Sequence, residues 1–348
     1  MRCEVLSTET NAEFQAAVQR AVSQLRTGGL VALPTETVYG LAANALDAGA
    51  VQQIFEVKGR PASNPLIVHV ASLAMARKVV ARWPRRAQLL AIAFWPGPLT
   101  LVLPKSRKIP DVVSAGGPTV AVRWPRHWVT EAVIRKCGFP LAAPSANRST
   151  EVSPTLARHV AKGLGRRISL ILDGGAAWAG IESTVLDLTG TLPRILRPGP
   201  IHAESIAAVI GPLAKTGGAP VGPSKSPGQM PKHYSPRAKL FLFSTANLSE
   251  LTQYVAQQKF PKRAIHLLCR KLNVAHLRFG ELCLMPRRPE AYARALYGEL
   301  HRCDEAGADL ILVETPPRGP QWEAIRDRLQ RAACVEPEPV LSSRRAGN

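Results

Sequence analysis

A stretch rich in glycine, proline, serine and lysine interrupts the chain beyond its middle and separates two runs of regular sequence pattern. It covers residues 215–236 (KTGGAPVGPSKSPGQMPKHYSP), and this composition disfavours both helix and strand. The chain has 348 residues, about twice the usual length of one domain. We therefore predict two domains joined by a linker: an N-terminal domain over 1–214, a linker over 215–237 and a C-terminal domain over 238–348.

Short apolar strands and amphipathic helices alternate irregularly before the linker. Residues 13–27 carry apolar side chains at helical spacing, and Gly28 and Gly29 supply a left-handed end to this helix. The pattern predicts an α/β domain with a twisted mixed sheet covered by helices. We expect strands at 30–33, 66–70, 99–103, 120–122, 141–143, 169–172, 184–188 and 194–196, and further helices at 48–57, 73–81 and 87–94.

Strands and helices alternate regularly after the linker, which is typical of a smaller, Rossmann-like parallel α/β domain. The expected strands are 240–243, 264–268 and 310–314, and the expected helices are 248–257, 290–303 and 322–333. No G-x-G-x-x-G opens a helix in either domain. The glycine-rich run 217–226 fails as a P-loop because Pro223 and Ser224 separate Gly222 from Lys225. A nucleotide bound by this chain must be held by scattered residues.

Charge and cysteine content narrow the class of protein. Lys and Arg outnumber Asp and Glu by 45 to 25, a net charge of +20, which favours polyanionic partners or substrates but also serves solubility. No run of about 18 apolar residues is present and the N-terminus lacks the apolar core of a signal peptide, so we expect a soluble, cytoplasmic protein without a membrane partner. Six cysteines without a CxxC pair favour reduced thiols, mostly in the core, over disulfides or a zinc site.

Polar residues gather at strand ends in the N-terminal domain. The segment PTETVYG (34–40) offers two Thr hydroxyls and a carboxylate after an apolar strand, although a capped turn before a helix is the favoured interpretation of this segment alone. Lys58 and Arg60 lie two residues apart at a helix end. Two cations this close repel each other unless an anion or solvent separates them, so a phosphate site and a solvated helix end fit equally well. His69 ends the next strand and is, taken alone, more often a core residue.

Further along the chain, Arg123 ends an apolar strand, where a structural salt bridge is at least as good an explanation as a ligand contact. The small-residue loop 143–154 carries hydroxyl and amide groups that can donate to phosphate oxygens, but it also fits an ordinary Pro/Ser loop. Ser183 and Arg197 again lie beside strands. Each motif is weak alone, but together they are the arrangement expected of a substrate cleft in an α/β sheet.

These motifs, in this order, resemble the Sua5/YrdC/YciO family, and in particular its two-domain, Sua5-type threonylcarbamoyl-AMP synthases. The match covers nearly the whole chain through KGRPASNPLIVHV, VAVRWP, APSAN, GIESTVLDL, LRPGPI and SPGQMPKHYSP. The resemblance implies a nucleotidyltransferase that condenses L-threonine, CO2 or bicarbonate and ATP into threonylcarbamoyl-AMP and pyrophosphate, for the t6A modification of tRNA position 37. It implies Mg2+ bound through the ATP phosphates, downstream t6A transferase proteins as partners, and tRNA as a further candidate partner.

The resemblance also implies the site residues, with Lys58 and Arg60 catalytic, the Ala143 contact made by backbone, and the linker folded over the active site as a lid. It places these residues at ATP: Lys58, Arg60, Asn64, Thr119, Ser145, Asn147, Ser153, Arg197 and Tyr234. It places these residues at L-threonine: Thr35, His69, Arg123, Ala143 and Ser183. No side-chain cluster is expected to hold a metal by itself.

Three alternatives stay open. A tRNA- or double-stranded-RNA-binding module without catalysis fits the +20 charge, and salt-dependent RNA binding without ATP turnover would favour it. A carbamoyl-transfer domain of the hydrogenase-maturation kind shares the fold, but those chains add an acylphosphatase region and zinc fingers, and this chain has no CxxC. The C-terminal domain, which lacks a nucleotide fingerprint, is expected to be only a stabilising or partner-docking domain.

Overall fold

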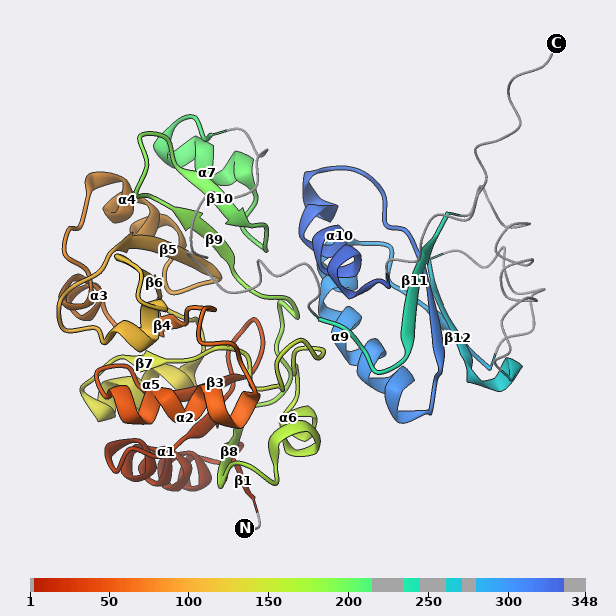
Figure 1. The fold of residues 1–348 in the computed structure, drawn as a ribbon, viewed down its shortest axis with the longest axis horizontal. Coiled ribbons are helices and arrows are strands. Elements are labelled where there is room, and N and C mark those ends of the chain that lie inside the picture. The colour runs from red at the N-terminus through yellow and green to blue at the C-terminus, as the bar shows by residue number, and fades with distance from the viewer. Residues whose placement is uncertain (1–2, 215–233, 245–260, 271–279, 335–348) are drawn as a thin grey trace.

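A ten-stranded mixed sheet organises the N-terminal domain, in the order β1-β8-β2-β3-β7-β4-β6-β5-β9-β10 (Figure 1). The computed structural model describes residues 3–214, 234–244, 261–270 and 280–334. The strands are β1 (Glu4–Ser7), β2 (Val31–Leu33), β3 (Gly40–Asn44), β4 (Ile67–His69), β5 (Leu99–Pro104), β6 (Thr119–Arg123), β7 (Leu141–Ala142), β8 (Leu170–Asp173), β9 (Thr184–Asp187) and β10 (Arg194–Arg197). The predicted mixed sheet is confirmed.

Helices cover both faces of this sheet. They are α1 (Asn11–Arg26), α2 (Ala48–Lys58), α3 (Leu73–Val79), α4 (Arg85–Phe94), α5 (Trp128–Cys137), α6 (Ala157–Leu164) and α7 (Ala203–Ile210), with the 3-10 turn η1 (Asp111–Ser114). One apolar core joins α1 and α5 to the sheet, and a second joins α2, α3, α4 and α6. Helix α1 begins with a capping box between Thr10 and Glu13, and Gly28 follows it at φ 79°, as its glycine pair predicted.

The segment 34–40 was predicted, taken alone, to cap a helix, and this prediction is wrong. Strand β3 follows it and pairs antiparallel with β2. The first four residues of the strand, GLAA of GLAAN, are apolar and lack the alternation with polar residues that would have marked it. The segment therefore connects two neighbouring strands. The elements β1, α5, α6 and α7 were not predicted.

The C-terminal domain contains four described strands, all parallel, in the order β11-β14-β12-β13. They are β11 (Lys239–Phe243), β12 (Ile265–Cys269), β13 (Glu281–Leu284) and β14 (Leu310–Glu314), with helices α9 (Pro289–Glu305) and α10 (Pro320–Ala332) and the turn η3 (Lys262–Ala264). The predicted parallel α/β domain is confirmed, although β13 was not predicted. The predicted helix 248–257 and most of the predicted linker lie outside the described residues.

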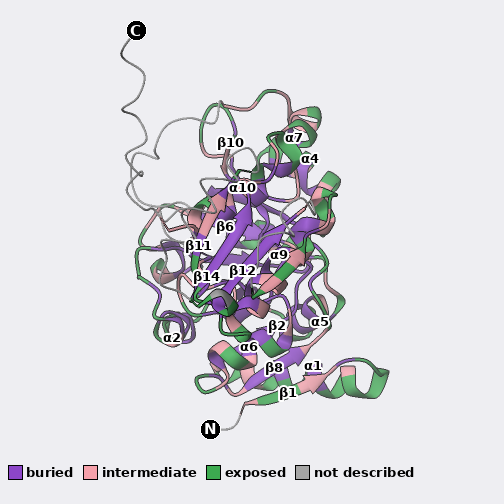
Figure 2. Ribbon diagram, turned by 90° about the vertical axis from the view of Figure 1, so that its right-hand side faces the viewer, coloured by how far each residue is buried: buried purple, intermediate pink, exposed green. Residues whose placement is uncertain are grey.

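Helices α9 and α10 lie between the two sheets and face the N-terminal domain (Figure 1). Val38, Val152 and Ile181 of the N-terminal domain join the apolar core of these helices. Arg294 of α9 donates from Nε to the Trp178 carbonyl at 2.7 Å. The central strands of both sheets are buried (Figure 2). The apolar core of the C-terminal domain therefore continues across the contact between the domains.

The structure can be compared with the predictions about the cysteines and about membrane-spanning helices. All six cysteines are free, and Cys137, Cys269 and Cys303 are buried while the other three are partly buried. Within the described ranges, no helix combines the length and the apolar character needed to cross a bilayer.

Candidate active site

A small cavity that is partly open to solvent lies where strand ends of the large sheet meet Tyr234, the first described residue near the end of the predicted linker. It is lined by Thr35, Thr37, Val38, Gly40, Arg60, Ile67, His69, Arg123, Ala143, Pro144, Ser145, Glu182, Arg197 and Tyr234. Eight of these are predicted site residues: Thr35, Arg60, His69, Arg123, Ala143, Ser145, Arg197 and Tyr234. Residues separated by up to 199 positions in the chain are thus brought to one hollow.

The sheet register explains why these side chains meet. His69 ends β4 and Arg123 ends β6, and the two residues are register partners in a parallel pair. Register partners on adjacent strands lie about 5 Å apart and point to the same face. Ala143 follows β7, the next strand over, and its amide donates to the Ile67 carbonyl at 2.9 Å. Because β7 runs antiparallel to β4, Ala143 lies beside Ile67, at the other end of β4 from His69. Strands β4 and β7 are only three and two residues long, so residues at both ends of β4 line the cavity.

Buried cations give the cavity a positive potential. Burial lowers the pKa of Arg60 to about 9, and the charge of Arg197 acts in the same direction. Backbone carbonyls fix both side chains: Arg60 donates to Asn64 at 3.0 Å and to Pro65 at 2.8 Å, and Arg197 donates to Ser183 at 3.1 Å. The Asn64 carbonyl thus helps to fix the Arg60 side chain. A buried cation gains free energy when an anion approaches, so this cavity suits a polyanion such as a triphosphate.

Lys58, the last residue of α2, lies behind the cavity wall. Gly59 ends the helix at φ 60°, and the Lys58 ammonium turns inward to donate to the carbonyls of Ser145 at 2.6 Å and Asn147 at 2.5 Å. Lys58 and Arg60 are 3% and 7% exposed, so the interpretation as a solvated helix end is wrong. Burial, and then the charge of Arg60, lower the pKa of Lys58. Lys58 holds the loop that presents Ser145 to the cavity.

The other end of the cavity carries a buried ion pair. Arg123 Nη2 lies 2.7 Å from Glu36 Oε2, and the Glu36 side chain is fully buried. The salt bridge that the sequence left open for Arg123 therefore exists, and Glu36 is its carboxylate. Burial, and then the charge of Arg123, keep the pKa of His69 well below its usual value, so His69 is neutral at pH 7. Thr35 donates from Oγ1 to the Val38 carbonyl at 2.6 Å, which fixes the segment that carries Glu36.

Ser183 and Ser153 contact residues of the lining. Ser183 Oγ lies 2.8 Å from Thr100 Oγ1 and accepts from Arg197 at 3.2 Å. Ser153 donates from Oγ to Glu182 at 2.6 Å. Glu182 also accepts from Tyr297 and Arg328 of the C-terminal domain, at 3.1 and 2.8 Å. Sequence reasoning missed Glu36, Glu182 and these two partners; the acidic residues inside PTETVYG and GIESTVLDL were the available signal.

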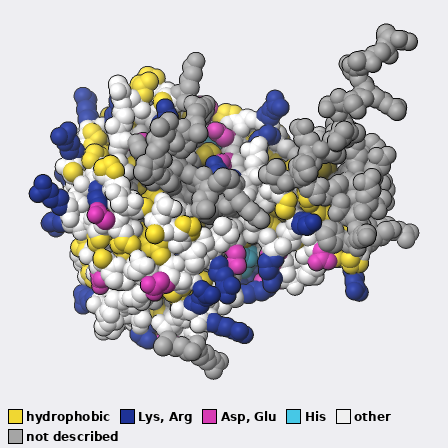
Figure 3. Space-filling view, viewed as in Figure 1, with side chains coloured by type: hydrophobic (Ala, Val, Ile, Leu, Met, Phe, Trp, Pro, Cys, Tyr) yellow, Lys and Arg dark blue, Asp and Glu magenta, His cyan; other side chains and the backbone are white. Residues whose placement is uncertain are grey.

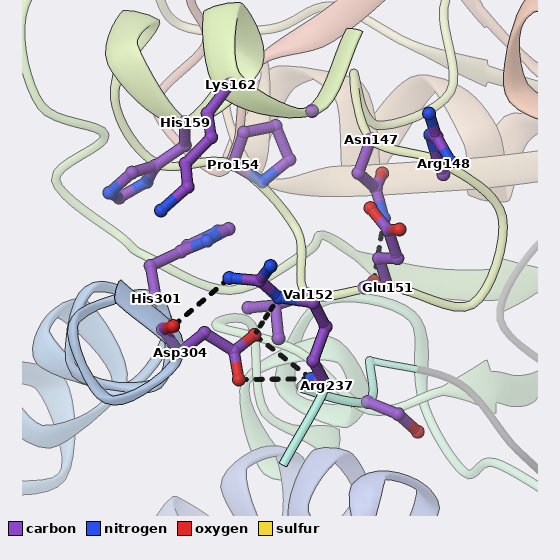
Figure 4. A pocket seen from close by; sticks show the side chains of 12 residues that line it. Asn147, Arg148, Glu151, Val152, Pro154, His159, Lys162, Arg237, His301 and Asp304 are labelled. Atoms are coloured by element: carbon purple, nitrogen blue, oxygen red, sulfur yellow. Dashed lines mark hydrogen bonds and ion pairs between the residues drawn. The ribbon is translucent and has the colours of Figure 1, made fainter. Parts of the chain in front are cut away.

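Two predicted ATP residues lie away from this lining. Thr119 begins β6 and pairs with Pro104 of β5, at the opposite end of its strand from Arg123. Asn147 lines a second, partly open cavity between α6 and α9, whose wall also includes Arg148, Lys162 and Arg237 (Figure 4). Basic side chains are visible at the junction of the two domains (Figure 3).

The acidic groups of the site do not form a metal centre. Among the described residues, no three His, Cys, Asp or Glu side chains come together as ligands. The Glu182 carboxylate in the cavity is already engaged by Ser153, Tyr297 and Arg328. Mg2+ keeps several waters in its coordination shell and is commonly held by substrate phosphates together with one or two carboxylates.

Both domains match known family models. The model Sua5_yciO_yrdC, described as "Telomere recombination", matches residues 23–199. The model described as "Threonylcarbamoyl-AMP synthase, C-terminal domain" matches residues 201–334. The chain belongs to the Sua5 family. The resemblance inferred from the motifs is therefore confirmed across both domains.

The similarity to individual members of the Sua5 family extends over nearly the full length of this chain. The chain is 40% identical over 322 residues to the threonylcarbamoyl-AMP synthase of Pyrococcus abyssi, covering 91% of this chain and 94% of that protein. It is 41% identical over 321 residues to the Bacillus subtilis protein of that name, covering 91% and 92%. The crystal structure of Pyrococcus abyssi Sua5 complexed with L-threonine superimposes with a TM-score of 0.87 at 38% identity, covering 96% of this chain and 98% of that one.

Proposed function

We propose that this protein is an L-threonylcarbamoyl-adenylate synthase, a nucleotidyltransferase that uses L-threonine, CO2 or bicarbonate, and MgATP. One observation carries the proposal: Arg60, Ser145 and Arg197, assigned to ATP, share a single cavity with His69, Arg123 and Ala143, assigned to threonine. The relatives that bear this activity as their name cover over nine-tenths of the chain. A cavity that holds both substrates side by side is what the condensation requires.

The threonine carboxylate would bind at Arg123. A guanidinium has five N–H donors; Nε donates to the Gly97 carbonyl at 3.3 Å, and Nη2 lies 2.7 Å from Glu36 Oε2 in an ion pair that lacks hydrogen-bond geometry. The Glu36 pair therefore fixes the plane of the guanidinium while other donors serve the ligand. Neutral His69 adds no second cation beside Arg123. The threonine amine, as the neutral nucleophile, captures CO2 to form a carbamate and releases a proton to solvent.

The carbamate oxygen would then attack the α-phosphorus. The new O–P bond forms as the bond from the α-phosphorus to the bridging oxygen breaks, and pyrophosphate leaves; Mg2+ bound to the phosphates would help to neutralise its charge. No protein nucleophile is required, because positioning and charge neutralisation supply the catalysis. Arg60 and Arg197 balance the phosphate charge, Lys58 holds the Ser145 loop, and Ser145 donates to a phosphate oxygen. The same assignment places Asn64, Thr119, Asn147 and Ser153 at or near the nucleotide.

The product is a mixed anhydride that water hydrolyses, so closure of the site would protect it. Tyr234, directly after the residues outside the described ranges, is fully buried in the cavity lining. This position supports the proposal that the linker covers the site. We further propose that the product passes to a cytoplasmic t6A transferase that acts on tRNA.

The test is pyrophosphate release from MgATP by purified protein, with threonine and bicarbonate each omitted in turn. We expect release only when both are present, and mass spectrometry should detect threonylcarbamoyl-AMP. Release that ignores threonine would contradict the proposal. Salt-dependent RNA binding without any release would favour the non-catalytic RNA-binding alternative instead.

A further inference from the structure

Arg328 of α10 is buried at the floor of the candidate active site, although it belongs to the C-terminal domain. Its side chain is 0% exposed, and its Nε lies 2.8 Å from Oε2 of Glu182, which lines the cavity. Its guanidinium carbon lies 5.2 Å from the ring centre of Tyr234, a second lining residue. A cation from the second domain thus touches two walls of the cavity.

Glu182 needs such a cation. Burial alone would raise its pKa, but the charges of Arg328 and then Arg197, with the hydrogen bond from Ser153, lower it to about 2. The carboxylate is therefore ionised at neutral pH, in a cavity that we assign to a triphosphate. Like charges in a poorly hydrated space repel strongly. Unless Glu182 is neutralised from outside the cavity, it opposes the substrate.

Arg328 and Arg197 both stabilise the ionised carboxylate of Glu182. Arg197 comes from β10 and lines the cavity, whereas Arg328 approaches from α10 behind it. If Arg328 were absent, the charge of Glu182 would fall on Arg197 alone, and Arg197 would be less able to stabilise phosphate. Tyr234 would also lose the cation that lies over its ring.

We propose that Arg328 is a positioning residue for the nucleotide: by neutralising Glu182 and supporting Tyr234, it keeps Arg197 directed to the phosphates. The C-terminal domain is then part of the nucleotide site rather than only a stabilising or docking domain. This inference rests on the proposed function, because it assumes that ATP occupies the cavity.

The experiment compares ATP binding by calorimetry and the KM values of the full chain in three variants: Arg328→Met, Glu182→Gln and the double variant. We expect Arg328→Met to weaken ATP binding at least tenfold and to raise the KM for ATP accordingly, with the KM for threonine changed less than threefold. Removing the uncompensated carboxylate in the double variant should restore ATP affinity to within about threefold of the wild type. Arg328 also pairs with Asp327, at 2.7 Å. The control is Arg331→Met, since Arg331 is on the same helix and pairs with the same carboxylate at 2.9 Å.

The outcomes separate the two claims. Unchanged ATP affinity in a folded Arg328→Met variant, or a double variant no better than the single one, overturns the role of Arg328. If Arg328→Met does not fold, ATP affinity is measured in the folded double variant and in Arg328→Lys. An affinity like that of the wild type in both variants supports the role of Arg328. A tenfold loss of affinity in the double variant overturns it. A wild type that binds ATP in an Arg328-dependent way but releases no pyrophosphate contradicts the proposed function alone.

Discussion

The backbone of Gly180 in the N-terminal domain packs directly against the backbone of Arg294 in α9 of the C-terminal domain. A Cβ atom at Gly180 would lie 2.4 Å from Arg294 Cα and 2.6 Å from the Ala293 carbonyl oxygen. Both obstructing atoms belong to a helix backbone, which cannot rotate away as a side chain can. Gly180 therefore permits the domains to approach closely beside the cavity that contains Glu182.

We expect Gly180→Ala to weaken the docking of the two domains. Gly180 has φ 74°, so alanine costs about 1 kcal/mol from backbone conformation, and the overpacking adds roughly 1–3 kcal/mol. The control is Gly307→Ala, which has φ 78° and open space around its Cβ position. Denaturant unfolding should show a clearly larger loss for Gly180→Ala. Equal losses would mean that the contact has no energetic importance.

Lys58→Ala should abolish threonine-dependent pyrophosphate release. The substitution removes the donor to the Ser145 and Asn147 carbonyls, so the loop loses its anchor and the cavity loses a nearby positive charge. Loss of a hydrogen bond from a charged donor corresponds to about 1.5–3 kcal/mol, and the effect on turnover should exceed a hundredfold because the phosphate position shifts as well. Lys108→Ala, at an exposed position, serves as the control. Near-normal release by the Lys58 variant would argue against its role.

Arg123→Lys should raise the KM for threonine at least tenfold, equivalent to about 1.4 kcal/mol, with little change in the KM for ATP. Lysine keeps the charge but loses the planar fork that can serve Glu36 and a carboxylate at once. Steady-state kinetics with each substrate varied separately provides the measurement. Arg126→Lys, an exposed neighbour, is the matched control. A comparable rise in both KM values would instead indicate general damage to the cavity.

Stability should fall below about pH 6.5 through two stacked histidines that join the domains. His159 of α6 and His301 of α9 have ring centres 3.9 Å apart. Burial, then the positive charges of His301, Arg158 and Lys162, lower the pKa of His159 to about 3. Burial also lowers the pKa of His301, against the opposing effects of the Ser153 carbonyl, Asp304 and Glu305.

Because both pKa values are lower in the folded state, the unfolded chain takes up protons first as the pH falls below about 6.5. Each such proton costs up to about 1.4 kcal/mol of stability per pH unit, and for His159 the loss continues toward pH 3. Melting temperatures between pH 4 and 8 should therefore depend less on pH in His301→Gln than in the wild type. Other buried histidines, such as His69, contribute equally to the pH dependence of both proteins, so their contribution drops out of the comparison. A His202→Gln control should keep the wild-type slope, and identical slopes in all three proteins would contradict the prediction.

Much of the fold was predictable from local pattern. The predicted helix over 13–27 is present as α1, and the predicted strand over 310–314 is present as β14 with the same bounds. Such elements can be predicted because the spacing of apolar residues along a short segment determines whether a helix or a strand places them all on one buried face. Most of the candidate site was predictable for a different reason. The polar residues lie within a few positions of recognisable strand ends, and the short strands of this mixed sheet, which run in both directions, bring those ends to one cavity.

The sequence by itself therefore determined many of the elements, the two-domain organisation and the family's motif set. Only the tertiary structure decided that Lys58 reaches the carbonyl of Ser145, 87 positions away, and that Arg328 reaches Glu182 across 146 positions and a domain boundary. Neither contact has a local signature, since a lysine at a helix end or an arginine on an amphipathic helix ordinarily faces solvent. Their burial depends on which surfaces pack together, and that is a property of the whole folded chain.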